Sequence, residues 1–444
     1  MSDKVKRSEG LSMFAAIAFA VGTMVGAGVF VLSGMVIDLA GPSALLSYLL
    51  CGVIVSFSAL SYAALASVFP EDGGGYLYAR RMIGDYPGFL AGWAMYISML
   101  IATSFVLLGF GIYLNLLLGT EIDPRLAAIA AVILLTALNL RGLSEAGKLE
   151  VGLVAVKITI LILFAIVGLI HIQRTSFVPF LIHGVGGVLQ GMTMVFFAYM
   201  GFQVVSMMGG EIKESSKTVP RATLASIGIV ATIYLGVIIA LICANLPSYG
   251  SKSVFDASVV LLGTYGGTIV ALAAMISALS SANANIIGAS RVTLEMASEK
   301  QIPGRFARLK NNQPFNSILL GSVITAGLIV YGDLNFIVNL TNAAMLSTMV
   351  LVNVSAFMLV KKEKQMPPEK GYFKTPLGTL FPTLGAVSCI LLLISLPPTT
   401  IALGIAALLL GSILYILEDT PEGHLAVEEI RRLLKRPIND TEGG

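Results

Sequence analysis

Long apolar stretches follow one another along this chain and are separated by short polar segments. The first stretch, 11–37, carries no charged residue and exceeds the roughly 20 residues that a helix needs to cross the hydrocarbon core of a bilayer. The pattern recurs and predicts an all-α integral membrane protein. Its twelve expected membrane-spanning helices lie at 11–38, 43–69, 87–118, 126–140, 151–171, 185–209, 222–246, 258–287, 315–332, 336–360, 378–396 and 399–417.

Two of these apolar stretches are interrupted near their middle by glycines. The first interruption carries Gly22, Gly26 and Gly28, and the second carries Gly201. A helix broken inside a bilayer exposes backbone N–H and C=O groups, so the break persists only where protein or a polar ligand supplies partners. Matching breaks in two halves of a transporter mark its binding site. The alternative is that the glycines only allow close helix packing, as small residues do in bilayers.

Composition and charge agree with a membrane protein. The chain has 56% hydrophobic and 12% charged residues and a mean hydropathy of +0.88, whereas soluble domains are about 25% charged. Twenty-four of its 28 Lys and Arg residues fall in loops on one side of the predicted spans, and only Arg125, Arg174 and Lys252 in loops on the other. Since basic loops stay in the cytoplasm, both termini are predicted to be cytoplasmic. These bases orient the chain in a plasma (inner) membrane and require no nucleic acid partner.

Five spans make up each half of the predicted transmembrane region. Because five is odd, a second copy of the same fold enters the membrane with the opposite orientation, so 11–171 and 185–360 are predicted to be inverted repeats. The interrupted helices are then the first span of each repeat. The last two spans, at 378–417, follow as an appendage. Cytoplasmic tails are predicted at 1–10 and 418–444.

The residue pattern offers no support for enzymatic or metal chemistry. Cys51, Cys243 and Cys389 lie within three different apolar spans, as buried small hydrophobes do, and the three histidines have no metal-ligand spacing. The sequence has no Gly-x-x-x-x-Gly-Lys-Ser/Thr loop for ATP. It also lacks a nucleophile, general base and orienting group that occur together. We therefore expect no enzyme, cofactor or metal, and a transporter driven by a gradient or by exchange.

Six motifs occur along the chain in a fixed order. They are Gly22-x-x-x-Gly26-x-Gly28-Val29-Phe30, Pro70-x-x-Gly73-Gly74-x-Tyr76-x-Tyr78, Gly92-Trp93, Asn139-x-x-Gly142, Phe197-x-Tyr199-x-Gly201-Phe202 with Glu211 and Pro220-Arg221-Ala222, and Arg291-x-x-Leu294-x-Met296-Ala297 with Pro303. In these motifs the chain resembles the amino acid/polyamine/organocation transporter superfamily, and in particular its proton-coupled, broad-specificity amino acid permeases. The resemblance covers nearly the whole transmembrane region.

The resemblance implies where an amino acid binds. Its carboxylate is expected beside Gly26, at the backbone N–H groups of Ala27 and Gly28. Its ammonium group is expected at carbonyl oxygens of both interrupted helices, those of Met24, Phe197, Ala198 and Met200. Helix N-termini attract carboxylates and unwound carbonyls attract ammonium groups, so the chemistry of the two breaks agrees. Phe202 is either a gate over the substrate or ordinary packing.

Lys157 is a lone base within an apolar span. It lies nine residues after Lys148, about 13 Å along a helix, which is near the middle of a hydrocarbon core about 30 Å thick. Burial lowers the pKa of a lysine, so Lys157 can exchange a proton. The resemblance implies that its ammonium takes the place of the sodium ion used by relatives. Two other interpretations stay open: snorkelling to the cytoplasmic edge, or a charged strut that bonds carbonyls near Gly22 and the hydroxyls of Ser280 and Ser281.

The sequence therefore predicts a secondary transporter that imports neutral amino acids by proton symport with alternating access. Neutral substrates are expected because Gln203 stands where cationic amino acid carriers have Asp or Glu, and an unpaired buried charge is costly. The coupling ion is expected to be a proton and not sodium. The alternatives are an exchanger, an uncoupled facilitator, or a sensor that binds an amino acid without moving it. The expected partners are the substrate and the lipid bilayer, with no obligate protein partner evident.

Overall fold

The structure, a computed structural model, is helical throughout its described part. It describes residues 10–141, 146–172, 174–310, 313–362 and 372–419. Within these ranges it contains α-helices, short 3-10 helices and two isolated β-bridges, and no strand. The predicted all-α class is confirmed. The predicted terminal tails lie almost entirely outside the described residues.

Helices occupy every apolar stretch that the sequence pattern predicted as a span. The first half holds α1 (Met13–Met24), α2 (Ala27–Ala40), α3 (Ala44–Val68), α5 (Asp85–Leu118), α6 (Pro124–Leu140) and α7 (Ala146–Ile170). The second half holds α8 (Gly184–Tyr199), α9 (Gln203–Met207), α10 (Ser215–Cys243), α11 (Ser253–Ser298), α12 (Phe315–Tyr331) and α13 (Leu334–Lys362), followed by α14 (Leu380–Ile394) and α15 (Pro398–Asp419). Eight helical segments of the described chain are long and apolar enough to cross a membrane, and four shorter helices are also apolar. The inverted repeat remains a prediction.

The first and sixth predicted spans are each divided into two helices. α1 ends at Met24 and α2 begins at Ala27, whereas α8 ends at Tyr199 and α9 begins at Gln203. Gly201, between α8 and α9, has a φ of 133°, a conformation that residues with a Cβ rarely adopt. Both interruptions therefore lie where the glycines predicted them.

Two parts of the chain differ from the expectation. The loop expected after α3 contains a further helix, α4 (Gly75–Met82), whose Arg80 and Arg81 made it too polar for a search for apolar spans. The span expected at 258–287 is part of a longer helix. This helix, α11, runs from Ser253 to Ser298 and has a kink at Gly263, where φ is 75°. The remaining short helices are η1 (Gly41–Ser43), η2 (Arg174–Phe177), η3 (Gly209–Glu211) and η4 (Gly304–Ala307).

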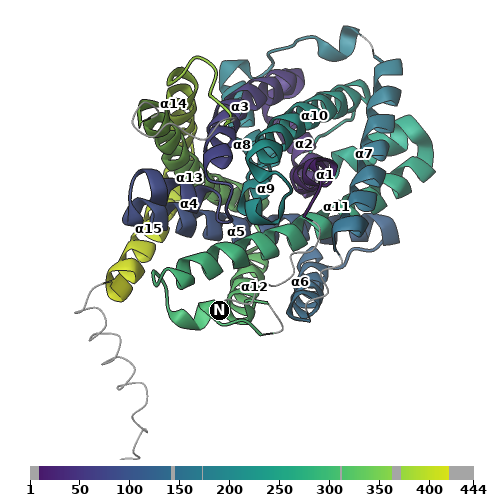
Figure 1. Cartoon of the computed structure of the whole chain (residues 1–444). Coiled ribbons are helices and arrows are strands. Elements are labelled where there is room, and N and C mark those ends of the chain that lie inside the picture. The colour runs from purple at the N-terminus through teal and green to yellow at the C-terminus, as the bar shows by residue number, and fades with distance from the viewer. Residues whose placement is uncertain (1–9, 142–145, 173, 311–312, 363–371, 420–444) are drawn as a thin grey trace, which may run out of the picture.

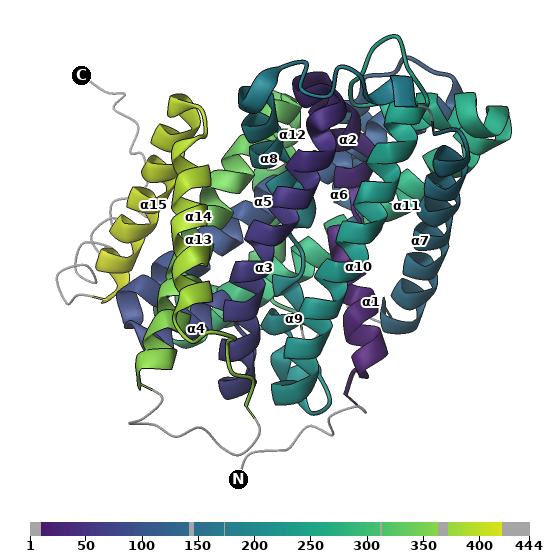
Figure 2. The same cartoon turned by 90° about the horizontal axis from the view of Figure 1, so that it is seen from above.

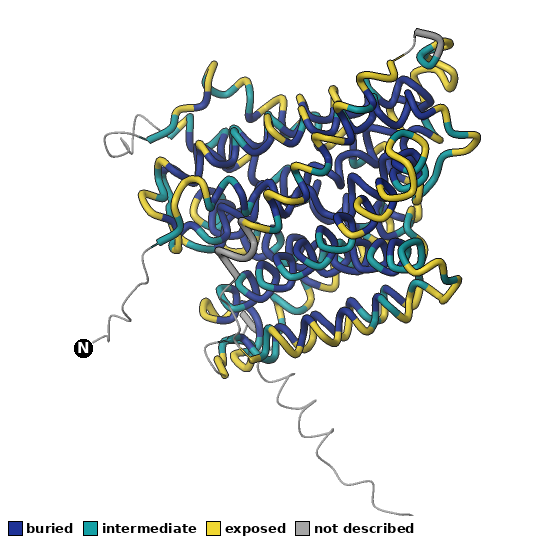
Figure 3. Tube along the Cα trace, turned by 90° about the vertical axis from the view of Figure 1, so that its right-hand side faces the viewer, coloured by how far each residue is buried: buried dark blue, intermediate teal, exposed yellow. Residues whose placement is uncertain are grey.

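The helices form a bundle with a buried centre. α5 packs most extensively against α11 and also against α13, while α10 packs against α3 and α7. α7 lies at one edge of the bundle, and α14 and α15 lie at the opposite edge (Figures 1 and 2). Exposed residues are concentrated along the outer helices, as Figure 3 shows. Many of them are large and apolar, such as Leu163 on α7 and Ile413 on α15, which suits a surface that faces lipid.

The three cysteines are buried and free, as the sequence predicted. Cys389 contacts the hydroxyl of Ser58 and the amide of Asn353. They are therefore part of the packing between helices.

Close packing of α7 against α10 depends on Gly168. A Cβ at this position would clash with the Cα and Cβ of Ala240, whereas a Cβ at Gly228 on α10 would meet no atom within 4 Å. We predict that Gly168→Ala lowers the Tm of the detergent-solubilised protein by several degrees, because overpacking costs about 1–3 kcal/mol. Gly228→Ala is the matched control and should leave the Tm unchanged or raise it, because Ala is the better helix former by about 0.5–1 kcal/mol. Equal effects of the two substitutions would contradict the need for close approach.

Candidate functional site

The two helix interruptions touch one another at the centre of the bundle. A Cβ on Gly201 would lie 2.7 Å from the backbone nitrogen of Met24, and a Cβ on Gly28 would lie 3.4 Å from the Cα of Ala198. Gly201 needs both its left-handed backbone and the absence of a side chain. The glycines thus bring two segments that are far apart in the sequence into backbone contact.

The last carbonyl oxygens before α2 find partners on other helices. A helix end leaves its last carbonyl groups without intrahelical donors. Here each of four successive carbonyls accepts a hydrogen bond from a side chain of α7, α10 or α11. The pairs are Lys157 Nζ with Gly22 O (2.6 Å), Ser281 Oγ with Thr23 O (3.2 Å), Tyr234 Oη with Met24 O (2.7 Å), and Ser277 Oγ with Val25 O.

Tyr234 connects the two interrupted helices. Its hydroxyl lies 2.7 Å from Met24 O at the end of α1 and 2.8 Å from Ala198 O near the end of α8. A phenol has one proton to donate, so the two carbonyl oxygens share it. Tyr234 was not among the site residues predicted from the sequence. It could have been found as a tyrosine within the apolar span 222–246, because a buried tyrosine hydroxyl usually finds a hydrogen-bond partner.

Lys157 is completely buried on α7 and donates to the carbonyl of Gly22. This contact agrees with the strut interpretation and excludes snorkelling to the edge, because the ammonium group is directed into the protein. Ser281 donates to Thr23 O, and Ser280 and Ser281 are both buried on α11.

A cavity of about 30 Å³ lies between the two interruptions. Its lining includes seven of the residues predicted from the sequence: Met24, Gly26, Gly28, Phe197, Ala198, Met200 and Ser281. Ala27 and Phe202 do not line it. Ala27 is the first residue of α2, whose N-cap Gly26 has no side-chain hydrogen bond, so the N–H groups at this helix start have no side-chain cap. Phe202 packs edge-on against Tyr62, with ring centroids 5.5 Å apart.

Gly201 and Gln203, which the sequence analysis named for the second interruption and for substrate charge, also line the cavity. The rest of the lining was not predicted from the sequence and consists of Thr23, Ser98, Met99, Ala102, Val106, Asn285, Thr341 and Met345. None of the lining residues is charged. Gln203 accepts a hydrogen bond from the backbone N–H of Gly201 (2.9 Å) and so supports the second interruption. These residues give no local signal, because α5, α11 and α13 bring them to the cavity only when they pack.

The comparisons with known proteins agree with this architecture. A family model described as "Amino acid permease" matches residues 11–417. The chain belongs to the amino acid permease family. This confirms the resemblance found in the sequence, and it confirms that the protein is a multi-pass membrane transporter and not an enzyme.

Several permeases and transporters are similar to the chain along most of their length. The chain is 27% identical over 431 residues to the methylthioribose transporter of Bacillus subtilis (strain 168), with 92% of each chain covered. It is 28% identical over 432 residues to the branched-chain amino acid permease BcaP of the same strain, again with 92% of each covered. It is 27% identical over 405 residues to BcaP of Lactococcus lactis subsp. cremoris (strain MG1363), covering 84% of this chain and 86% of that protein.

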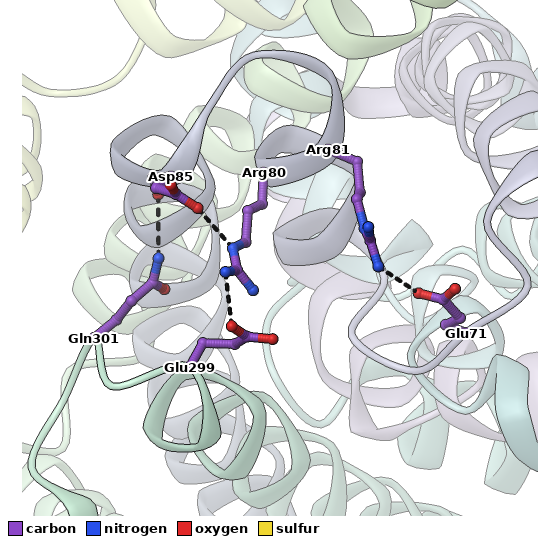
Figure 4. Close-up of polar contacts among 6 residues, drawn as sticks. All are labelled: Glu71, Arg80, Arg81, Asp85, Glu299 and Gln301. Atoms are coloured by element: carbon purple, nitrogen blue, oxygen red, sulfur yellow. Dashed lines mark hydrogen bonds and ion pairs between the residues drawn. The ribbon is translucent and has the colours of Figure 1, made fainter. Parts of the chain in front are cut away.

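An ion-pair network holds one end of the permease bundle together. Arg80 lies between two carboxylates, with Nε 2.8 Å from Asp85 and Nη2 2.7 Å from Glu299 (Figure 4). It therefore ties the α4–α5 corner to the residue that follows α11. The amide of Gln301 donates to the backbone carbonyl of Asp85 (3.4 Å), which adds a second link between these segments.

Two further ion pairs extend this network. Arg81 pairs with Glu71 at 3.2 Å, and Arg291 on α11 pairs with Glu211 in η3 at 3.3 Å. The hydrogen bond to Glu299 raises the pKa of Arg80, and the same bond lowers the pKa of Glu299 below its usual range.

Tyr234→Phe tests the link between the two interruptions. The substitution removes the hydroxyl that Ala198 O and Met24 O share, and a buried polar group without its partner costs about 1–3 kcal/mol. We expect a clear decrease in Tm, measured by thermal denaturation in detergent. Tyr113→Phe is the matched control, because its hydroxyl donates to the carbonyl of Phe30 inside helix α2. A Tyr234→Phe protein no less stable than Tyr113→Phe would show that the link is dispensable.

The contribution of Glu299 to stability should depend on pH. Because its folded-state pKa is lowered, the stabilisation is present above the ordinary value of 4.5 and is lost as the pH falls through the lowered value. The Tm difference between wild type and Glu299→Gln should thus exist at pH 7 and shrink below pH 4.5. It should correspond to at most about 1 kcal/mol, because the pair is partly exposed. Lys217→Gln, which removes an exposed 3.8 Å pair with Glu214, serves as the control with no expected shift.

Proposed function

We propose that this permease imports neutral amino acids across the plasma membrane by proton symport, with alternating access to the central cavity. The observation that supports the proposal most is the cavity itself, which has no charged lining residue and lies between two interrupted helices. An amino acid zwitterion carries one negative and one positive group. The start of α2 and the ends of α1 and α8 offer complementary backbone groups at one place.

The carboxylate is assigned to the first N–H groups of α2, at Ala27 and Gly28. The ammonium group is assigned to carbonyl oxygens of the α8 end. Ala198 O already accepts from Tyr234, and Phe197 O accepts from the backbone N–H of Met200 (3.1 Å). Each carbonyl oxygen has a second lone pair for the ammonium group. The backbone therefore binds the groups that all amino acids share.

Lys157 is assigned to proton coupling. Its ammonium group makes a charge-assisted bond to Gly22 O, and such bonds are stronger than neutral ones. Loss of the proton would weaken the contact between α7 and the end of α1, at the residue directly before the cavity-lining Thr23. Protonation would thereby favour one arrangement of the interrupted helix. The strut interpretation, in which Lys157 stays protonated throughout, corresponds to an exchanger or an uncoupled facilitator.

The orientation follows from the distribution of charge. We assign both termini and the ion-pair network around Arg80 to the cytoplasmic side, because the basic loops are there. Residues 11–171 and 185–360 are proposed as the two inverted repeats, each beginning with an interrupted helix. A sensor that does not transport remains the alternative from another class.

A second substrate class has support from one relative. The methylthioribose transporter of B. subtilis is similar to the chain along 92% of both proteins. The cavity also carries polar side chains, including Ser98, Asn285 and Thr341, that can bond hydroxyl groups. We therefore include methylthioribose in the substrate test.

The decisive experiment measures uptake into proteoliposomes. Labelled alanine, serine, leucine and methylthioribose are supplied with and without an acid-outside pH gradient. We expect an amino acid to accumulate above equilibrium only with the gradient. Lys157→Gln should retain uptake down the substrate gradient but lose its dependence on pH, with Lys252→Gln at an exposed position as the control. Uptake only against preloaded substrate would identify an exchanger, and binding without uptake would identify a sensor.

A further inference from the structure

Methionine is concentrated around the central cavity. Four of the 17 lining residues are Met24, Met99, Met200 and Met345, although methionine makes up only 18 of the 444 residues of the chain. Fewer than one would be expected from composition alone. They come from four places in the fold: the end of α1, α5, the interruption after α8, and α13. Methionines from four separate segments of the chain therefore line the cavity.

Glycines adjoin two of these methionines. The Sδ and Cε of Met99 lie 3.2 Å and 3.0 Å from the position that a Cβ would take on Gly288 of α11, and the Cγ of Met24 lies 2.9 Å from that position on Gly201. The Sδ of Met345 lies 4.0 Å from the amide nitrogen of Gln203. Each of these three methionine side chains thus lies beside a glycine or beside the flexible side chain of Gln203. A change of rotamer is therefore not opposed by a branched side chain at that neighbour.

The cavity is small, so its wall has to move when a substrate side chain enters. A volume of 30 Å³ holds on the order of two water molecules and is smaller than a leucine side chain. Packed protein interiors resist expansion, so a larger side chain enters only if part of the wall moves. Methionine has three rotatable bonds and a polarizable sulfur, and it fills gaps of variable shape better than branched residues do.

We propose that these four methionines form an adaptable compartment for the side chain of the substrate, so that the permease accepts aliphatic and thioether side chains of different sizes. The proposal rests on the proposed function, in which backbone groups of the interrupted helices bind the carboxylate and ammonium groups. Size is accommodated by rotation of the Met99 and Met345 side chains, and the absence of charge in the lining keeps charged side chains out.

The test compares substrate selectivity in matched pairs of variants. Uptake of labelled alanine into proteoliposomes is measured in competition with leucine, methionine and phenylalanine. Met99→Ala and Met345→Ala enlarge the compartment and should improve competition by phenylalanine relative to alanine by about tenfold. Met95→Ala and Met349→Ala are the controls, because these methionines are fully buried one turn away on α5 and α13 and do not line the cavity.

A second set of variants tests adaptability separately from size. Met99→Ile and Met345→Ile keep the apolar character but introduce a stiff β-branched side chain. In these variants, competition by leucine and methionine for the uptake of labelled alanine should fall by about tenfold relative to the wild type, whereas Met95→Ile and Met349→Ile should leave it unchanged. Size-exclusion chromatography in detergent verifies that each variant is folded.

The methionine compartment would be overturned if the Met99 and Met345 variants kept the selectivity of the wild type, or if the control variants changed equally. The proposed function would still be supported in that case, provided that the wild type took up alanine. If the wild type took up no amino acid, the proposed function would fail instead. The compartment would then be tested by uptake of methylthioribose, whose methylthio group it should also receive. Met345→Ile should reduce that uptake and Met349→Ile should not; an equal response would reject the compartment.

Discussion

The centre of this permease depends on satisfying backbone polar groups where no water is available to do so. α1 stops in apolar surroundings, and its last carbonyl oxygens have no donors in their own helix. Lys157, Ser281, Tyr234 and Ser277 supply those donors from α7, α10 and α11. The packing of these helices around α1 therefore supplies the hydrogen-bond donors that the interruption requires.

The backbone polar groups that still lack a full set of partners are those that can bind a ligand. The carbonyl groups at the end of α1 already have donors, whereas the N–H groups at the start of α2 have no side-chain cap. The hydroxyl of Tyr234 links the end of α8 to the end of α1. The cavity lies where the two interrupted helices meet. A ligand there can accept hydrogen bonds from the N–H groups at the start of α2 and can donate to the second lone pairs of the carbonyl oxygens.

Charge is distributed in a way that matches this chemistry. The ion pairs of Arg80, Arg81 and Arg291 lie at one end of the bundle, where solvent lowers the cost of charge. The cavity has no charged lining residue, and Lys157 is the exception near it, fully buried against a backbone carbonyl. A buried ammonium group beside the interruption is costly, which favours a role for Lys157 in the transport cycle in addition to its bond to Gly22 O.

The sequence by itself determined the apolar helices, the positions of both interruptions, the family, and the backbone part of the candidate site around Gly26 and Gly201. These features depend on local signals, since runs of apolar residues and glycines act on the chain where they stand. Only the tertiary structure decided the contacts of Tyr234 and the side-chain walls of the cavity, such as Met99, Asn285 and Met345. Each is a single residue on a long helix, and only the packing of α5, α10, α11 and α13 determines which face of each helix meets the cavity. The physical reason is that helix formation is encoded by neighbours in sequence, whereas a binding surface is made by residues that become neighbours on packing.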